Sequence, residues 1–297
     1  MRTVRQPAVA GRFYPGRPVD LDAMVVSLLK AARDSTAASV RPPKALIVPH
    51  AGYIYSGPTA ACGYDRLLAG RGQYRRVVLL GPAHYVGFSG LAISTADAFA
   101  TPLGEVELDV AGAKALLEVP GVRELDEAHA PEHSLEVQLP FLQRVLNEFK
   151  LLPIVVGDAA PVTVASVLQA CWDGDQTLLL VSSDLSHYLS YEQAERVDAN
   201  TVRHILELSG PLPEGAACGG RGINGLLLAA ASRRLTPRLL DYRNSGDTAG
   251  DRNRVVGYAA IAWLLRYVST RSYLPFVVYR IVLGGLTGVM VALVVDA

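Results

Sequence analysis

Short apolar runs alternate with amphipathic stretches along most of the chain. Four runs are typical of strands buried on both faces of a sheet, at residues 45–48, 76–80, 151–156 and 177–181. Stretches with the period of a helix occupy residues 20–33, 58–69, 109–118, 134–149, 161–172 and 190–207. This alternation predicts an α/β sandwich with a largely parallel sheet.

Three of the predicted strands end directly in side chains that can do chemistry. These residues are His50, His84 and Asp184. In open α/β sheets, ligands bind in the crevice outside the carboxyl ends of the strands. A lone histidine after a strand is more often a hydrogen-bonded loop residue, but three such residues at three strand ends favour a common site.

Further candidates stand near these strand ends in sequence motifs. Imidazole and thiolate are good ligands for iron, copper or zinc, and Cys218 is followed by two glycines that allow close approach. Asp184 and His187 are three residues apart and could orient and carry a proton. Each candidate also has a structural interpretation, since Cys218 could be packing material and Glu132 and His133 could belong to the start of a helix.

Composition and missing motifs exclude several classes of protein. The 297 residues carry 28 basic and 28 acidic side chains. The net charge is therefore zero and gives no electrostatic attraction to nucleic acid. Cys62, Cys171 and Cys218 show no CxxC spacing, which argues against a disulfide framework and fits the cytoplasm. The nucleophile elbow, the Walker A loop and the dinucleotide fingerprint are absent, which disfavours serine hydrolysis and nucleotide binding. No motif surrounds His129 or His204, and we expect both at the surface.

The motifs of the chain, in their order, resemble those of the Memo family, known in prokaryotes as AmmeMemoRadiSam system protein B. The matching stretches are RQPAVAGRFYP at 5–15, VPHAGY at 48–53, LGPAH at 80–84, EHSLEVQLPF at 132–141, VSSDLSH at 181–187, CGGRGING at 218–225 and VGYAA at 256–260. The resemblance covers about residues 1–265, and we expect a Memo-like α/β domain over residues 1–266.

The resemblance implies a fold related to the class III extradiol dioxygenases of the LigB type: a three-layer sandwich around a parallel or mixed sheet. It implies iron or copper, with zinc less favoured, and metal ligands at His50, His84 and Cys218. It places Asp184 and His187 in the same pocket, with His187 as the acid/base, and Phe13 at the rim. To these we add Glu132 as a candidate catalytic residue, and Tyr53 and His133 as candidate substrate contacts.

The same resemblance indicates one difference from the dioxygenase metal site and two protein partners. The dioxygenases bind iron with two histidines and a carboxylate, whereas the matching third ligand here is Cys218, a softer donor that favours copper(I), zinc or thiolate-bound iron. Prokaryotic members of the family are associated with a radical-SAM protein and an AMMECR-type protein, and we expect both as partners.

The C-terminal residues 272–297 lie outside the resemblance. The stretch from Pro275 to Val295 has one charge, Arg280, and is long enough to cross a membrane as a helix. We expect a hydrophobic tail that either anchors the chain to the cytoplasmic membrane or is a fusion remnant without function.

Three functions remain open at this point. The first is a metal-dependent, dioxygenase-like or redox protein built on the two histidines and the cysteine. The second is a binding module without chemistry, which would hold a small molecule, a peptide or a partner loop in the same pocket. The third is metal-assisted hydrolysis with Glu132 as base, which the cysteine ligand makes less attractive.

Overall fold

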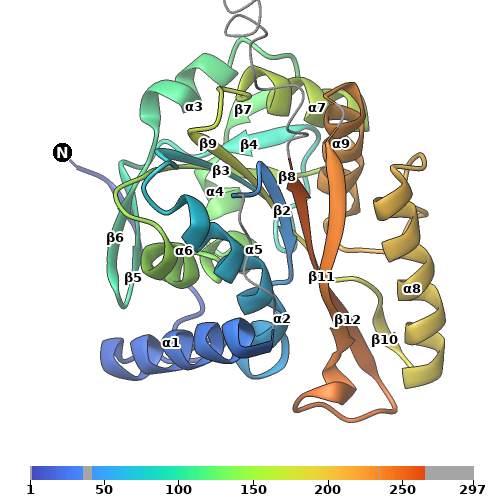
Figure 1. Cartoon of the computed structure of the whole chain (residues 1–297). Coiled ribbons are helices and arrows are strands. Elements are labelled where there is room, and N and C mark those ends of the chain that lie inside the picture. The colour runs from blue at the N-terminus through green and yellow to red at the C-terminus, as the bar shows by residue number, and fades with distance from the viewer. Residues whose placement is uncertain (1, 36–41, 234, 265–297) are drawn as a thin grey trace, which may run out of the picture. The chain divides into compact units, whose positions relative to one another are not determined.

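The four predicted strands form the parallel centre of a mixed sheet (Figure 1). The computed structural model describes residues 2–35, 42–233 and 235–264. The central strands, in their spatial order, are β2 (Ala45–Val48), β9 (Thr177–Ser182), β3 (Arg76–Pro82) and β8 (Lys150–Val156). All three pairs of neighbours are parallel, so the carboxyl ends of all four strands meet at one edge of the sheet.

Strands on both sides of this centre make the sheet mixed. Next to β2 lies β12 (Val255–Leu264), which is antiparallel to β2 and also pairs with β10 (His187–Leu189) and β11 (Thr236–Asn244). On the other side β4 (Leu91–Ile93) is antiparallel to β8 and carries β7 (Val122–Glu124) at its edge. A separate small sheet contains β1 (Val4–Arg5), β5 (Ala98–Thr101) and β6 (Gly104–Glu107).

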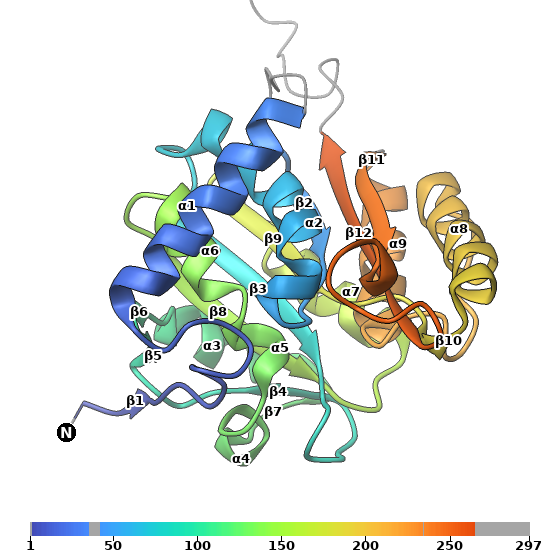
Figure 2. The same cartoon turned by 90° about the horizontal axis from the view of Figure 1, so that it is seen from below.

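Helices cover both faces of the main sheet, as Figures 1 and 2 show. One face carries α1 (Pro18–Ser35), α2 (Tyr53–Asp65) and α6 (Leu139–Val145), and the other carries α7 (Pro161–Ala170), α8 (Tyr191–Glu207) and α9 (Gly220–Ser232). The shorter elements are α3 (Val110–Leu116), α4 (Asp126–His129), α5 (His133–Glu136) and 3₁₀ turns at Arg66–Gly70 and Ser245–Asp247. Glycines allow two of the helices to lie close to the strands: Gly63 of α2 faces Val48, and Gly222 of α9 faces Val181.

The observed elements confirm the four predicted strands and correct one predicted helix. The stretch 134–149 forms two short helices, α5 and α6, instead of one. Pro140 explains the break, because proline in a helix interior removes a hydrogen bond and its ring clashes with the carbonyl four residues earlier. Leu146 then adopts an extended conformation that ends α6 before β8 begins.

The described residues belong to one packed unit that ends at Leu264. No helix among them is both long enough and apolar enough to span a bilayer. The predicted hydrophobic tail, 272–297, lies outside the described residues.

The surface position expected for His129 is wrong. His129 is buried, and its Nε2 donates to the carbonyl of Ala92 at 3.1 Å, while its Nδ1 has no hydrogen-bond partner among the described residues. Burial lowers the pKa of His129 to about 4, because the loss of hydration of the charged imidazolium outweighs the hydrogen bond to Ala92 and the attraction of Asp126.

This burial predicts a pH dependence of stability. An unfolded histidine binds a proton near pH ~6.5, whereas the folded protein keeps His129 neutral down to about pH 4. The contribution of the neutral His129 to the free energy of unfolding is therefore fully present above pH ~6.5 and is lost as the pH falls toward ~4. We expect His129→Gln, which keeps a donor for Ala92, to make the slope of unfolding free energy against pH shallower by up to ~1.4 kcal/mol per pH unit. Urea denaturation between these pH values measures it.

His204→Gln on α8 is the matched control, since His204 lies on a helix face that is only partly buried. Equal slopes for wild type and His129→Gln would show that the buried imidazole does not titrate as described.

Candidate metal centre

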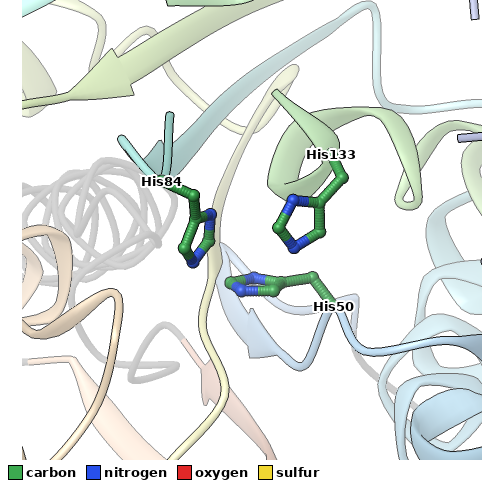
Figure 3. Close-up of side chains that lie close together, drawn as sticks. All are labelled: His50, His84 and His133. Atoms are coloured by element: carbon green, nitrogen blue, oxygen red, sulfur yellow. The ribbon is translucent and has the colours of Figure 1, made fainter. Parts of the chain in front are cut away.

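Three imidazoles meet at the carboxyl edge of the parallel strands (Figure 3). His50 follows β2, His84 follows β3, and His133 is the first residue of α5. One ligand nitrogen from each ring lies within 4.8 Å of the other two, and Figure 3 shows the rings facing a common space. His50 is buried and His84 is the most exposed of the three.

The outer nitrogen of each ring is already occupied by a neighbour. Nδ1 of His84 lies 2.8 Å from Oε1 of Glu132, and Nδ1 of His133 lies 3.2 Å from the hydroxyl of Tyr85. Nδ1 of His50 lies 2.9 Å from Oγ of Ser182. These contacts leave the Nε2 atoms for a ligand in the middle, which is how metal-binding histidines are usually oriented.

Hydrogen-bond roles assign the proton on His50. The hydroxyl of Ser182 donates to the carbonyl of Ser134 at 2.6 Å, and its oxygen accepts from Nε2 of Gln138 at 2.7 Å. Because its only proton is committed, Ser182 accepts from Nδ1–H of His50. His50 therefore presents the lone pair of Nε2 to the cluster.

Two buried carboxylates hold the strand-end loops instead of facing the centre. Glu132 accepts from the backbone N–H of His84 at 2.8 Å and from that of Ser134 at 2.9 Å, in addition to the ring of His84. Asp184 accepts from the backbone N–H of His50 at 2.7 Å. Both predicted catalytic carboxylates thus lie at the site, and their oxygens bind the backbone that carries the histidines.

The electrostatic environment keeps the buried rings neutral. Burial, followed by repulsion from His84, lowers the pKa of His50 to about 3, and burial with repulsion from His50 and His84 lowers that of His133 to about 4. Burial alone would raise the pKa of Glu132, but its hydrogen bonds with His84 and Ser134 outweigh it and lower the value to about 2. Neutral imidazoles are the form that binds metal ions.

Cys218, the third predicted ligand, lies at the edge of the cluster. Its Sγ is 3.3 Å from Nε2 of His50, and it accepts from the backbone N–H of Asp184 at 3.2 Å. The three donor atoms that lie within 4.8 Å of one another belong to His50, His84 and His133. Burial and the nearby Asp184 raise the pKa of Cys218 to about 12, so the group is a neutral thiol before any metal binds.

The remaining predicted residues take different positions. Phe13 lies against the cluster, with its ring centroid 4.6 Å from that of His133. His187 starts β10 and is close enough that its charge affects the pKa values of His50 and Asp184. Tyr53 is buried in the core, where its hydroxyl donates to the carbonyl of Val137 at 2.6 Å, a placement that gives no support to substrate contact.

Comparison with known proteins identifies the family. The model of the Memo-like protein family matches residues 5–262. A MEMO1 family protein of Aquifex aeolicus is 37% identical over 282 residues, which cover 88% of this chain and 99% of that protein. The chain belongs to the Memo family. MEMO1 family proteins of Methanopyrus kandleri and Methanosarcina barkeri are 37% and 38% identical, each over 87% of this chain and 98% and 99% of their own lengths.

In this Memo-family chain a third buried carboxylate, that of Glu136, secures the segment that carries Phe13. Glu136, on the same short helix as His133, forms an ion pair with Arg5 and accepts from the backbone N–H groups of Ala8 at 2.7 Å and Val9 at 3.0 Å. A further hydrogen bond comes from the hydroxyl of Tyr14 at 2.5 Å. The N-terminal segment, residues 4–14, is therefore tied to the helix that begins with His133.

The sequence patterns missed several residues that shape this Memo-family site. They are Arg5, Tyr85, Glu136, Gln138 and Ser182. All except Tyr85 stand inside the matching stretches, and Tyr85 directly follows His84, so their positions were visible but their roles were not. Gly81 was also missed: it lies so close to α5 that a Cβ there would be 2.4 Å from Oγ of Ser134.

We expect Glu136→Gln to destabilise the fold strongly. The side chain of Glu136 is fully buried and that of Arg5 is 7% exposed, and removing one partner of a buried ion pair costs about 3–5 kcal/mol. The free energy of unfolding from urea titration measures the loss. Glu148→Gln, at an exposed carboxylate just before β8, is the matched control and should change stability by less than about 0.5 kcal/mol. Equal effects of the two substitutions would contradict the role given to Glu136.

Proposed function

We propose that this Memo-family protein is a metal-dependent oxidoreductase of the dioxygenase-like kind, with His50, His84 and His133 as its metal ligands. One observation carries the proposal: three imidazoles converge, with one nitrogen of each ring within 4.8 Å of the other two and with each Nδ1 atom engaged by a neighbour. Buried groups with perturbed pKa values at the strand ends of an α/β sheet are typical of functional sites.

The donor set fits iron or copper. Imidazole nitrogen suits both metals, and such a metal supplies one-electron chemistry with dioxygen when it is bound. The set departs from the two-histidine, one-carboxylate arrangement of extradiol dioxygenases. Glu132 and Asp184 direct their oxygens to backbone N–H groups, and this supports a third histidine as the alternative ligand. A fold related to the LigB-type dioxygenases remains part of the proposal, supported by the mixed sheet with helices on both faces.

The residues of the chain divide the remaining work. Glu132 fixes the Nδ1–H tautomer of His84, and Ser182 does the same for His50. Burial raises the pKa of Asp184, and we assign the movement of a proton to Asp184 and His187. Glu132 is a weak base at a pKa of about 2, which argues against hydrolysis with this residue as the base.

Partners and location follow from the family resemblance. We propose that the protein acts in the cytoplasm with a radical-SAM protein and an AMMECR-type protein. Exposed aromatic side chains next to site residues support docking there: Tyr85 neighbours His133 and is 54% exposed, and Tyr188 neighbours His187 and is 63% exposed. Tyr188 also has a left-handed backbone with φ of 61°, a strained conformation that often marks functional sites. The same surface supports the second candidate, a binding module without chemistry.

Metal analysis with ligand variants tests the proposal. We expect the purified protein, stripped with chelator and reloaded under anaerobic conditions with ferrous iron or with copper(I), to bind about one ion per chain. His84→Ala and His133→Ala each remove one of three donors and should weaken binding by about 100-fold or more. Cys218→Ser should weaken binding less than either histidine variant, because Cys218 is not one of the three grouped donors.

The control is His204→Ala on α8, outside the described cluster, which should bind like wild type. A strong loss in Cys218→Ser with little change in His133→Ala would restore the two-histidine, one-cysteine set. Equally little metal in wild type and His84→Ala would contradict the metal function altogether.

A further inference from the structure

A pocket of about 250 Å³ lies at the carboxyl ends of β3, β8 and β9, beside the start of α9. Its wall includes Cys218, whose Sγ is 3.3 Å from Nε2 of His50. It also includes Ala83, which directly precedes His84, and Ser182, which contacts Nδ1 of His50. The pocket therefore adjoins the candidate metal centre.

Most side chains of this pocket are apolar. They are Leu80, Pro82, Ala83, Phe88, Val156 and Val181. Gly222 contributes by having no side chain: a Cβ there would lie 3.2 Å from Cγ1 of Val181 and 4.0 Å from Cβ of Leu80. Pockets of this composition bind the apolar body of a small molecule, and their few polar groups fix its orientation.

The charged side chains at the pocket are Arg221 and Asp158. Nη2 of Arg221 lies 2.9 Å from Oδ1 of Asp158, and the two side chains are 56% and 77% exposed. An ion pair this exposed contributes little to the free energy of folding. The guanidinium of Arg221 can therefore exchange Asp158 for a ligand carboxylate, which it binds with two parallel hydrogen bonds. Within the described chain, the backbone N–H groups of Arg221 and Gly222, in the first turn of α9, donate no hydrogen bond and favour a negatively charged ligand.

We propose that this pocket binds a small monocarboxylic acid with an apolar body. Arg221 holds the carboxylate, and the body lies between Leu80, Phe88 and Val181. The bound molecule is thereby presented beside Cys218 and His50. This inference rests on the proposed function in one respect, that it names the acid as the substrate class. The contacts that bind the acid involve no metal.

Binding of 3-phenylpropionate to the metal-free full chain tests the inference. The titration follows the methyl NMR signals of Leu80, Val156 and Val181, with the neutral 3-phenylpropionamide as the comparison ligand. We expect the acid to shift these methyls and to bind at least about tenfold more tightly than the amide. Arg221→Gln should weaken binding of the acid about tenfold, whereas Asp158→Asn should tighten it about threefold by freeing the guanidinium.

The opposite changes in affinity distinguish recognition of the carboxylate by Arg221 from a structural effect. If the ion pair mattered only for structure, both substitutions would change the affinity for the acid in the same direction. A second pair of variants tests the cavity: Gly222→Ala should weaken binding, and Gly220→Ala on the same helix should not, because its Cβ would meet nothing within 4 Å. Equal binding of acid and amide, equal direction of the Arg221 and Asp158 variants, or methyl shifts elsewhere would overturn the inference.

The titration also separates this inference from the metal function. A protein that binds the acid but takes up neither iron nor copper would contradict the metal function and leave the pocket in place. A protein that binds the metal but not the acid would contradict only the inference that this pocket binds a carboxylic acid.

Discussion

The candidate centre depends on one buried carboxylate. Glu132 accepts hydrogen bonds from the backbone and ring of His84 and from the backbone of Ser134, so it joins the end of β3 to the start of α5. Its Oε1 also lies 3.5 Å from Nδ1 of His133. Two of the three imidazoles are therefore placed by one ionised group. A buried charge is tolerated because each of these contacts replaces the water that the carboxylate gives up on folding.

The parallel centre of the fold could be predicted because its strands are short, uniformly apolar and buried on both faces. Strands β10 and β11 could not be predicted in this way, because both are partly exposed and neither shows a regular alternation of buried and exposed residues. Helix α9 was not among the predicted helices. A Cβ at Gly225 would lie 2.3 Å from Cγ1 of Val164 on α7, so this glycine allows α7 and α9 to pack closely. The sequence of one segment cannot reveal such a contact between two helices.

The site shows the same division between local and long-range information. His50 and His84 could be predicted from strand ends, since parallel strands bring their carboxyl ends together. His133 was expected only as a substrate contact, because its place depends on α5 lying against the end of β3, where Oγ of Ser134 donates to the carbonyl of Pro82 at 3.2 Å. The roles of Glu136 and Arg5 depend on a contact between residues 131 positions apart, which no local pattern carries.

Gly81 has a consequence for how this architecture could diversify. Any side chain there would push α5 away from β3, and His133 would move with the helix. The base of the centre therefore tolerates little variation in sequence. Tyr188 is largely exposed, and replacing it disturbs no core packing. New specificities can thus evolve through changes at the rim, while the arrangement of imidazoles beneath is inherited unaltered.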